Sequence, residues 1–147
     1  MAPAHSLRAS TRADDPHLRV FLEAAGLPAA DVETGQQEFL LLEEGGLLIG
    51  TIGLEKSGYD GLLRSLAVAP DRRGRGLADE LNDAALELAR ARGVRTLYLL
   101  TTTAERYAAR RGFERILRAV VPPGIAALAQ FRVLCPSTCV CMRRRLG

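Results

Sequence analysis

The sequence is short of three features: long hydrophobic runs, net charge and clustered aromatic side chains. No run approaches the roughly 18 apolar residues of a membrane-spanning helix, so we expect no membrane partner. The formal net charge is only +3, and the 4 Phe and 3 Tyr residues are scattered. Neither a basic surface nor a stacking platform for bases is indicated, which argues against nucleic-acid binding. The N-terminal residues lack the apolar segment of a secretory signal, and we expect a cytoplasmic protein.

The remaining composition is that of one globular domain. Hydrophobic residues make up 48% of the 147 residues and charged residues 25%, the usual balance of such a domain. A chain of this length buries a sizeable core in a single unit. Because no internal repeat or low-complexity linker divides the sequence, we expect one domain over residues 5–147.

The first half of the chain follows the pattern of strands and one helix. A first strand is indicated near residues 5–10, and a helix with Asp14 or Asp15 as its N-cap follows. Residues 38–70 form a series of apolar runs broken twice by turn residues. This pattern predicts three antiparallel strands joined by hairpins.

The second half of the chain alternates helices and strands. Leu77, Leu81 and Leu88 recur at helical spacing, which predicts an amphipathic helix that ends at Gly93. The predicted elements after it are a buried strand at 94–101, a helix opened by a capping box at Thr102 and Glu105, a strand at 113–120, a short helix at 122–131 and a last strand at 138–144. The whole pattern predicts an α/β (α+β) fold with a mixed sheet flanked by helices.

The segment VAPDRRGRGLADEL, residues 68–81, places two glycines and three arginines immediately before the amphipathic helix. The first N–H groups of a helix lack partners within it, and the helix dipole favours an anion there. Gly74 and Gly76 allow close approach to the backbone, and guanidinium groups suit phosphate oxygens. The arginines are Arg72, Arg73 and Arg75. The segment predicts a pyrophosphate site, with an ordinary arginine-rich turn as the alternative.

Two common phosphate-binding loops do not fit these residues. A P-loop requires GxxxxGK[ST], and no lysine lies near the segment. The dinucleotide fingerprint GxGxxG would need a third glycine where Asp79 stands, and the next strand has no acidic residue at the offset that binds a ribose.

The letters RGRGLA, residues 73–78, match the pattern [QR]-x-x-G-x-[GA] of the Gcn5-related N-acetyltransferase (GNAT) family. The strand LLRSLAVAP before them, the helix after them, the strand VRTLYLLT and the segment AERYAARRGF extend the resemblance over nearly the whole chain. The resemblance implies a GNAT-like mixed, mostly antiparallel central sheet in which strands 62–69 and 94–101 splay apart. It also implies acetyl-CoA as the co-substrate.

The same resemblance implies which residues bind acetyl-CoA. The pantetheine arm would run between the splayed strands and pair with the backbone of Leu66, Ala67 and Val68. The pyrophosphate would lie on Arg73, Gly74, Arg75, Gly76, Leu77 and Ala78.

The tail gives a narrower resemblance. VPPGIAALAQFRVLCPSTCVCMRR is similar to the tail of arsenic-resistance-type N-acetyltransferases, which carry an apolar helix, a Phe and a Cys-Pro before the last strand. The resemblance implies a primary amine of a small molecule as the acceptor, either amino-acid-like or a toxin.

A proton donor for the leaving thiolate is not clearly indicated. The family often has a tyrosine four residues before the glycine of its G-F pair, and here that place holds Ala108. Tyr107 lies one position earlier and is the candidate acid, with packing of its ring or protonation by water as alternatives. An N–H of Leu66 to Val68 is implied as the donor to the thioester oxygen.

A general base is equally open. Glu55 is the candidate base, and Asp60 is the other carboxylate near the strand at 62–69, although both could be solvated turn residues. An amine of low pKa would need no base. His5 and His17 are expected at the surface, and no catalytic Ser/His/Asp arrangement emerges.

The three cysteines are the last unusual feature. Cys139 and Cys141 fall on one face of a predicted strand, and with Cys135 they could hold a soft ion such as arsenite. Their spacing is no established zinc pattern, and buried cysteine commonly packs as a small apolar residue. We expect packing and no metal site.

The leading hypothesis is an acetyl-CoA-dependent N-acetyltransferase acting on the primary amine of a small molecule. Two alternatives stay open: a catalytically inactive acyl-CoA-binding sensor or subunit, and a thiol-based metalloid-binding protein. A homodimer is expected because it is common in the family.

Overall fold

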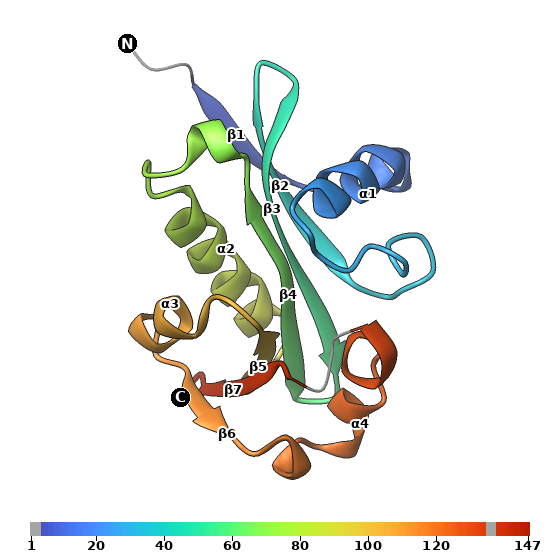
Figure 1. Cartoon of the computed structure of the whole chain (residues 1–147), viewed down its shortest axis with the longest axis vertical. Coiled ribbons are helices and arrows are strands. Elements are labelled where there is room, and N and C mark those ends of the chain that lie inside the picture. Colours follow the sequence, from blue (N-terminus) through green and yellow to red (C-terminus); the bar gives the residue numbers. More distant parts are fainter. Residues whose placement is uncertain (1–3, 135–137) are drawn as a thin grey trace.

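The computed structural model describes residues 4–134 and 138–147, which form a seven-stranded sheet in the order β1-β2-β3-β4-β5-β7-β6 (Figure 1). The strands are β1 (His5–Ala9), β2 (Glu38–Glu44), β3 (Leu47–Ser57), β4 (Asp60–Val68), β5 (Thr96–Thr101), β6 (Glu114–Ile116) and β7 (Val140–Arg145). β4 and β5 are parallel, and every other neighbouring pair is antiparallel. The sheet is open and mixed, as the sequence predicted.

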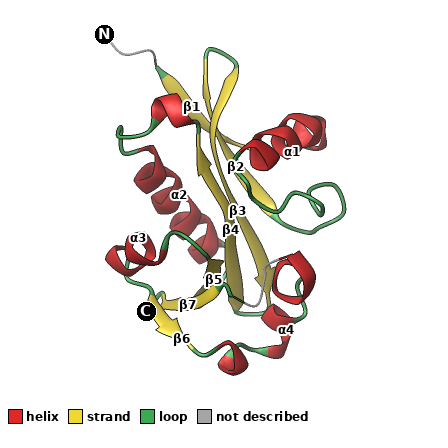
Figure 2. Ribbon diagram, in the orientation of Figure 1, coloured by secondary structure: helices red, strands yellow, loops and turns green. Residues whose placement is uncertain are grey.

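Helices cover both faces of this sheet (Figure 2). α2 (Leu77–Ala91) and α3 (Glu105–Arg110) lie on one side, and α1 (Asp15–Ala24) and the short α4 (Pro123–Ala126) lie on the other (Figure 1). None of the helices in the described ranges is long and apolar enough to cross a membrane.

Alternation along the strands divides the core between the two faces. On the α2 side, Leu81 packs in one cluster with Leu63 of β4. On the opposite side, Ile125 of α4 packs with Leu62 of the same strand. A third cluster holds α1 on the sheet through Leu18 and Leu22. The amphipathic period of α2 is thus satisfied by burial of one stripe on β3 and β4.

Two local predictions were wrong. The capping box at Thr102 and Glu105 does not form, because α3 begins after an N-cap at Ala104. The hydroxyl of Thr101 instead accepts hydrogen bonds from the N–H groups of Thr103 (3.3 Å) and Ala104 (2.9 Å), as the chain leaves β5. The strand expected at 113–120 is only three residues long, because β6 is an edge strand that pairs with β7 alone.

The divergence of β4 and β5 determines where the candidate site lies in the fold. The two strands pair only at Asp60–Thr96, Gly61–Leu97 and Leu62–Tyr98, and then diverge. On its other edge β4 stays paired with β3, with a break in register between Thr51 and Gly53. The second half of β4 therefore presents an open edge toward β5.

Candidate functional site

A cavity of about 550 Å³ fills the gap between β4 and β5. Residues 63–66 of β4 and residues 99–104 at the end of β5 form its long walls. On the α2 and α3 side it is lined by Asn82, Tyr107, Ala108, Arg111 and Phe113; on the α1 and α4 side it is lined by Gly26, Leu27, Pro28, Gln130 and Cys139. The lining residues of the cavity therefore come from both faces of the sheet.

The glycine loop before α2 has an open backbone. Gly74 and Gly76 take left-handed φ angles of 80° and 76°, which favour glycine. A Cβ at either position would meet nothing within 4 Å. The first hydrogen bond into α2 runs from the N–H of Glu80 to the carbonyl of Gly76 (3.1 Å). The amides before Glu80 are therefore open to an anion at the N-terminus of a 15-residue helix.

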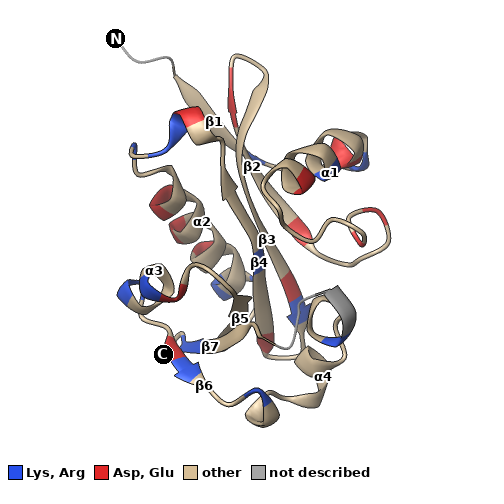
Figure 3. Ribbon diagram, in the orientation of Figure 1, with Lys and Arg blue, Asp and Glu red and all other residues tan. Residues whose placement is uncertain are grey.

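The loop before α2 carries three arginines (blue in Figure 3). Their side chains differ in the partners that they contact. Arg72 donates to Glu44 of β2 (2.9 Å) and pairs with Asp71. Arg75 lies 3.7 Å from the same Glu44 carboxylate and is otherwise exposed. Arg73 is exposed and has no ion pair among the described residues. Arg73 is thus the guanidinium most available to a phosphate, whereas Arg72 braces the loop against β2.

The two acidic residues in the first turn of α2 are both engaged. Asp79 accepts from the phenol of Tyr107 and lies 3.8 Å from Arg111. Glu80 contacts the ring of His5 at 2.7 Å. Both carboxylates thus have partners of their own, and the open amides and the exposed Arg73 remain as candidate ligands of a pyrophosphate.

The open edge of β4 directs particular amides toward the gap. The N–H of Ala69 bonds to Ile49 of β3 (2.8 Å). Because peptide groups alternate along a strand, those of Val68 and Leu66 then point away from β3, and that of Ala67 points toward it. Leu66 and Val68 are therefore better placed than Ala67 to pair with a ligand between the strands.

Tyr107 lies on the cavity wall between α2 and α3. Its hydroxyl donates to Asp79 Oδ1 (2.8 Å) and accepts from Asn82 Nδ2 (3.0 Å). Burial, together with the bond to Asp79, raises the pKa of Tyr107 to about 12. The phenol therefore keeps its proton at neutral pH. Ala108, in the family's tyrosine place, is buried and lines the same cavity.

The candidate bases lie outside this cavity. Glu55 is buried and accepts a hydrogen bond from Arg64 Nη1 (2.8 Å). Asp60 begins β4 at the closed end of the gap, and burial raises its pKa. Neither is among the described residues that line the cavity. A base role for Glu55 stays a prediction that would require its release from Arg64.

Sequence reasoning gave no role to the two polar residues inside β4, Arg64 and Ser65. Arg64 is bound by Asp31 as well as Glu55, and its neighbour Ser65 has a positive φ of 59°. Both Arg64 and Ser65 line the cavity. The available signal was a charged and a polar residue within the apolar run LLRSLAV.

The cysteines that the structure describes are packed in the core. Cys139 and Cys141 are buried in the cluster that contains Leu100 and Phe131. Burial raises the pKa of the Cys141 thiol. Cys135 lies outside the described residues, and within those residues no three His, Cys, Asp or Glu side chains form a metal-binding group.

Comparison with known proteins decides the family. Residues 5–117 match the family model of the acetyltransferase (GNAT) family. The chain belongs to the GNAT family. This confirms the family predicted from the sequence, and the coenzyme A held by solved structures of similar fold is consistent with the predicted acetyl-CoA co-substrate. The resemblance of the tail to arsenic-resistance enzymes stays a prediction.

Individual GNAT relatives add detail. The chain is 35% identical over 97 residues to the amino-acid acetyltransferase of Pseudomonas syringae pv. tomato, a match that covers 65% of this chain and 22% of that protein. It thus spans about a fifth of the length of the curated relatives it matches.

Solved structures share the fold. N-acetylglutamate synthase of Neisseria gonorrhoeae, complexed with coenzyme A and N-acetyl-glutamate, superposes with a TM-score of 0.79 at 22% identity, over 100% of this chain and 36% of that one. A GNAT acetyltransferase of Staphylococcus aureus Mu50 superposes with a TM-score of 0.83 at 18% identity, over 98% and 100% of the two chains.

Proposed function

We propose that this GNAT protein transfers the acetyl group of acetyl-CoA to the primary amine of a small amino acid or amino-acid-like molecule. The observation that carries the proposal is the cavity through the gap between β4 and β5, which reaches both faces of the sheet. The amino-acid acetyltransferase relatives support the acceptor class.

The α2 face supports donor binding. The pyrophosphate would lie on the glycine loop, residues 73–78, held by the open amides, Arg73 and Arg75. The pantetheine arm would pair with the open edge of β4 at Leu66 and Val68. The thioester would then lie in the gap, and the amine would enter from the α1 and α4 side.

Acetyl transfer requires mainly that the protein positions the amine beside the thioester, since acetyl-CoA already supplies an activated carbonyl carbon. The N–H of Leu66 or Val68 would donate to the oxygen on which charge develops. Tyr107 is the proposed proton donor to the departing sulfur, because its phenol is protonated and lines the cavity. With Glu55 held by Arg64, the amine most simply loses its proton to water.

The direct test is acetyl transfer by the purified protein to each of the twenty common amino acids, with release of the CoA thiol and formation of the N-acetyl product both measured. We expect at least one amino acid to be acetylated, and the product to disappear when Gly76→Glu blocks the loop. Gly93→Glu is the matched control, because Gly93 has the same left-handed backbone (φ 78°) and open surroundings away from the cavity.

One observation favours a second candidate function. Ala108 fills the place where the family often carries its tyrosine acid, which suits an acyl-CoA-binding protein without turnover. Acetyl-CoA binding with no acetylated amine in the same assay would favour that function. Product formation with any amine would remove it.

A further inference from the structure

Ser65 is held in a conformation that costs energy. It is the one residue other than glycine in the described ranges with a positive φ, 59°. Its carbonyl accepts a hydrogen bond from the buried Thr51 hydroxyl (2.8 Å), next to the break in β3–β4 register. Glycine would take this backbone without strain, yet the position carries a hydroxyl. Strain of this kind clusters at functional sites.

Arg64 is immobilised beside Ser65. Its guanidinium binds both oxygens of Asp31 (2.5 and 2.7 Å) and Glu55 Oε1 (2.8 Å), and its Nε donates to Ser65 Oγ (3.2 Å). Four of its five N–H donors thus have partners, and the side chain is only 1% exposed. A guanidinium bound on this many sides acts as a fixed cation.

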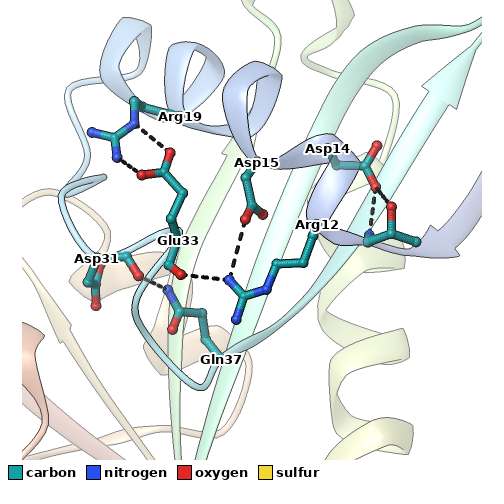
Figure 4. A network of polar contacts seen from close by, with 8 residues as sticks. Arg12, Asp14, Asp15, Arg19, Asp31, Glu33 and Gln37 are labelled. Atoms are coloured by element: carbon teal, nitrogen blue, oxygen red, sulfur yellow. Dashed lines mark hydrogen bonds and ion pairs between the residues drawn. The ribbon is translucent and has the colours of Figure 1, made fainter.

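Asp31 is fixed in turn by the loop after α1 (Figure 4). The amide of Gln37 donates to the Asp31 carbonyl (2.9 Å), and Arg12 donates to the carbonyl of Glu33 (2.7 Å). These bonds close the loop on itself and tie it to the turn that precedes α1. The Asp31 carboxylate is therefore held in place for Arg64.

The carboxylates and the hydroxyl of this cluster contact different nitrogens of Arg64. Asp31 and Glu55 bind the terminal nitrogens of Arg64, whereas Ser65 lies at Nε. Arg64 and Ser65 line the cavity, and the two carboxylates are not among its lining residues. The carboxylates thus lie on the side of Arg64 away from Ser65, and Ser65, next to the buried cation, is the residue of this cluster whose hydroxyl can meet a ligand in the cavity.

The Ser65 hydroxyl has a hydrogen left to donate, because its oxygen accepts from Arg64. We propose that this hydroxyl, backed by Arg64, binds a carboxylate oxygen of the acceptor and makes the enzyme selective for amines that carry a carboxylate on the adjacent carbon. The inference rests on the proposed function. Ser65 precedes Leu66, whose amide faces the thioester gap, so the bound carboxylate would hold the neighbouring amine near the reacting carbon.

The test compares acids with their amides. For the amino acid that the wild type acetylates best, kcat/KM is measured for that acid and for its α-carboxamide, which keeps the side chain and the amine. Ser65→Ala should lower kcat/KM for the acid by about 10- to 100-fold, the usual effect of a lost hydrogen bond to a charged group, and leave the carboxamide nearly unchanged. The KM for acetyl-CoA should not move.

Two further variants control for folding. Ser65→Gly relieves the backbone strain and should melt near the wild-type temperature, yet lose the same preference for the acid. Ser6→Ala, on the exposed face of β1, should change nothing.

Contrary results separate the two proposals. An unchanged ratio of acid to carboxamide in Ser65→Ala, or an equal loss on both substrates, would overturn the role of Ser65 while leaving the transferase intact. A wild type that acetylates no amino acid would overturn the proposed function and this inference with it.

Discussion

The hydroxyl of Tyr107 is the single side-chain proton that the proposed mechanism uses. Tyr107→Phe should lower kcat by about 100-fold, the low end of general acid catalysis, with acetyl-CoA affinity little changed. Since burial and Asp79 raise the pKa of Tyr107 to about 12, the acid form persists, and the wild-type rate should not fall from loss of this proton below about pH 10. Steady-state kinetics across pH measure both effects. A Phe variant with wild-type kcat would assign the protonation to water.

Two arginines of the glycine loop should have different roles: Arg73 should bind acetyl-CoA, and Arg72 should stabilise the loop. Arg73→Ala should weaken acetyl-CoA binding by about 10-fold, because it removes an exposed guanidinium that only a ligand engages. Arg72→Ala should lower the melting temperature instead, since Arg72 bonds to Glu44 of β2. Calorimetric titration and thermal melts of both variants distinguish these roles. Equal loss of affinity in the two variants would contradict the assignment.

At this scale the sequence predicted the glycine loop but not the polar group in β4. The loop is local, so its glycines and arginines stand together in the chain. Asp31 and Arg64 are 33 residues apart and meet only when the loop after α1 folds onto the sheet. The left-handed backbone of Ser65 follows from the β3–β4 register, which no local pattern records.

Among the elements, β1 and α1 are joined by one carboxylate. Asp14 accepts two hydrogen bonds from Arg8 (2.7 and 2.8 Å) and one from the N–H of Thr11 (2.7 Å). These bonds, Arg8 first, hold the pKa of Asp14 below its ordinary value. A lowered pKa in the folded state stabilises the protein above the unfolded value and loses that contribution as pH falls.

Asp14→Asn should therefore lower the free energy of unfolding by about 1 kcal/mol at pH 7, a modest figure because Arg8 is partly exposed. The difference from the wild type should shrink as the pH falls below about 4. Urea unfolding at several pH values measures it. Glu87→Gln, at an exposed residue with no ion pair among the described residues, is the control and should have no such effect. A difference that grows at acid pH would contradict the account.

Elements whose apolar residues recur with a clear helix or strand period could be predicted from the sequence. The arrangement of these elements in the sheet could be predicted only in part. α2 was expected from the spacing of its leucines, and the β2–β4 meander from its turn residues. The insertion of β7 between β5 and β6 could not be read from the chain, because strand pairing depends on contacts remote in sequence. The capping of α3 by Thr101 depends on how the chain leaves β5.

At the scale of the whole molecule, acetyl-CoA bound between β4 and β5 should stabilise the folded protein. A ligand that binds only the folded state raises its stability by about 2.7 kcal/mol at a concentration of 100 Kd. For a domain of this size the melting temperature should rise by roughly 5–10 °C. Thermal melts with and without acetyl-CoA measure the shift. No shift at saturating acetyl-CoA would argue against a site built between β4 and β5.

The central claim is that acetyl-CoA binds at the N-terminus of α2 and reaches into the gap. Calorimetric titration of acetyl-CoA into the wild type, Gly76→Glu and Gly93→Glu tests it most directly, because both substitutions add one carboxylate at a left-handed, open glycine. We predict that the wild type and Gly93→Glu bind and that Gly76→Glu does not, since its carboxylate would block and repel the pyrophosphate. Equal binding by all three proteins would contradict the claim.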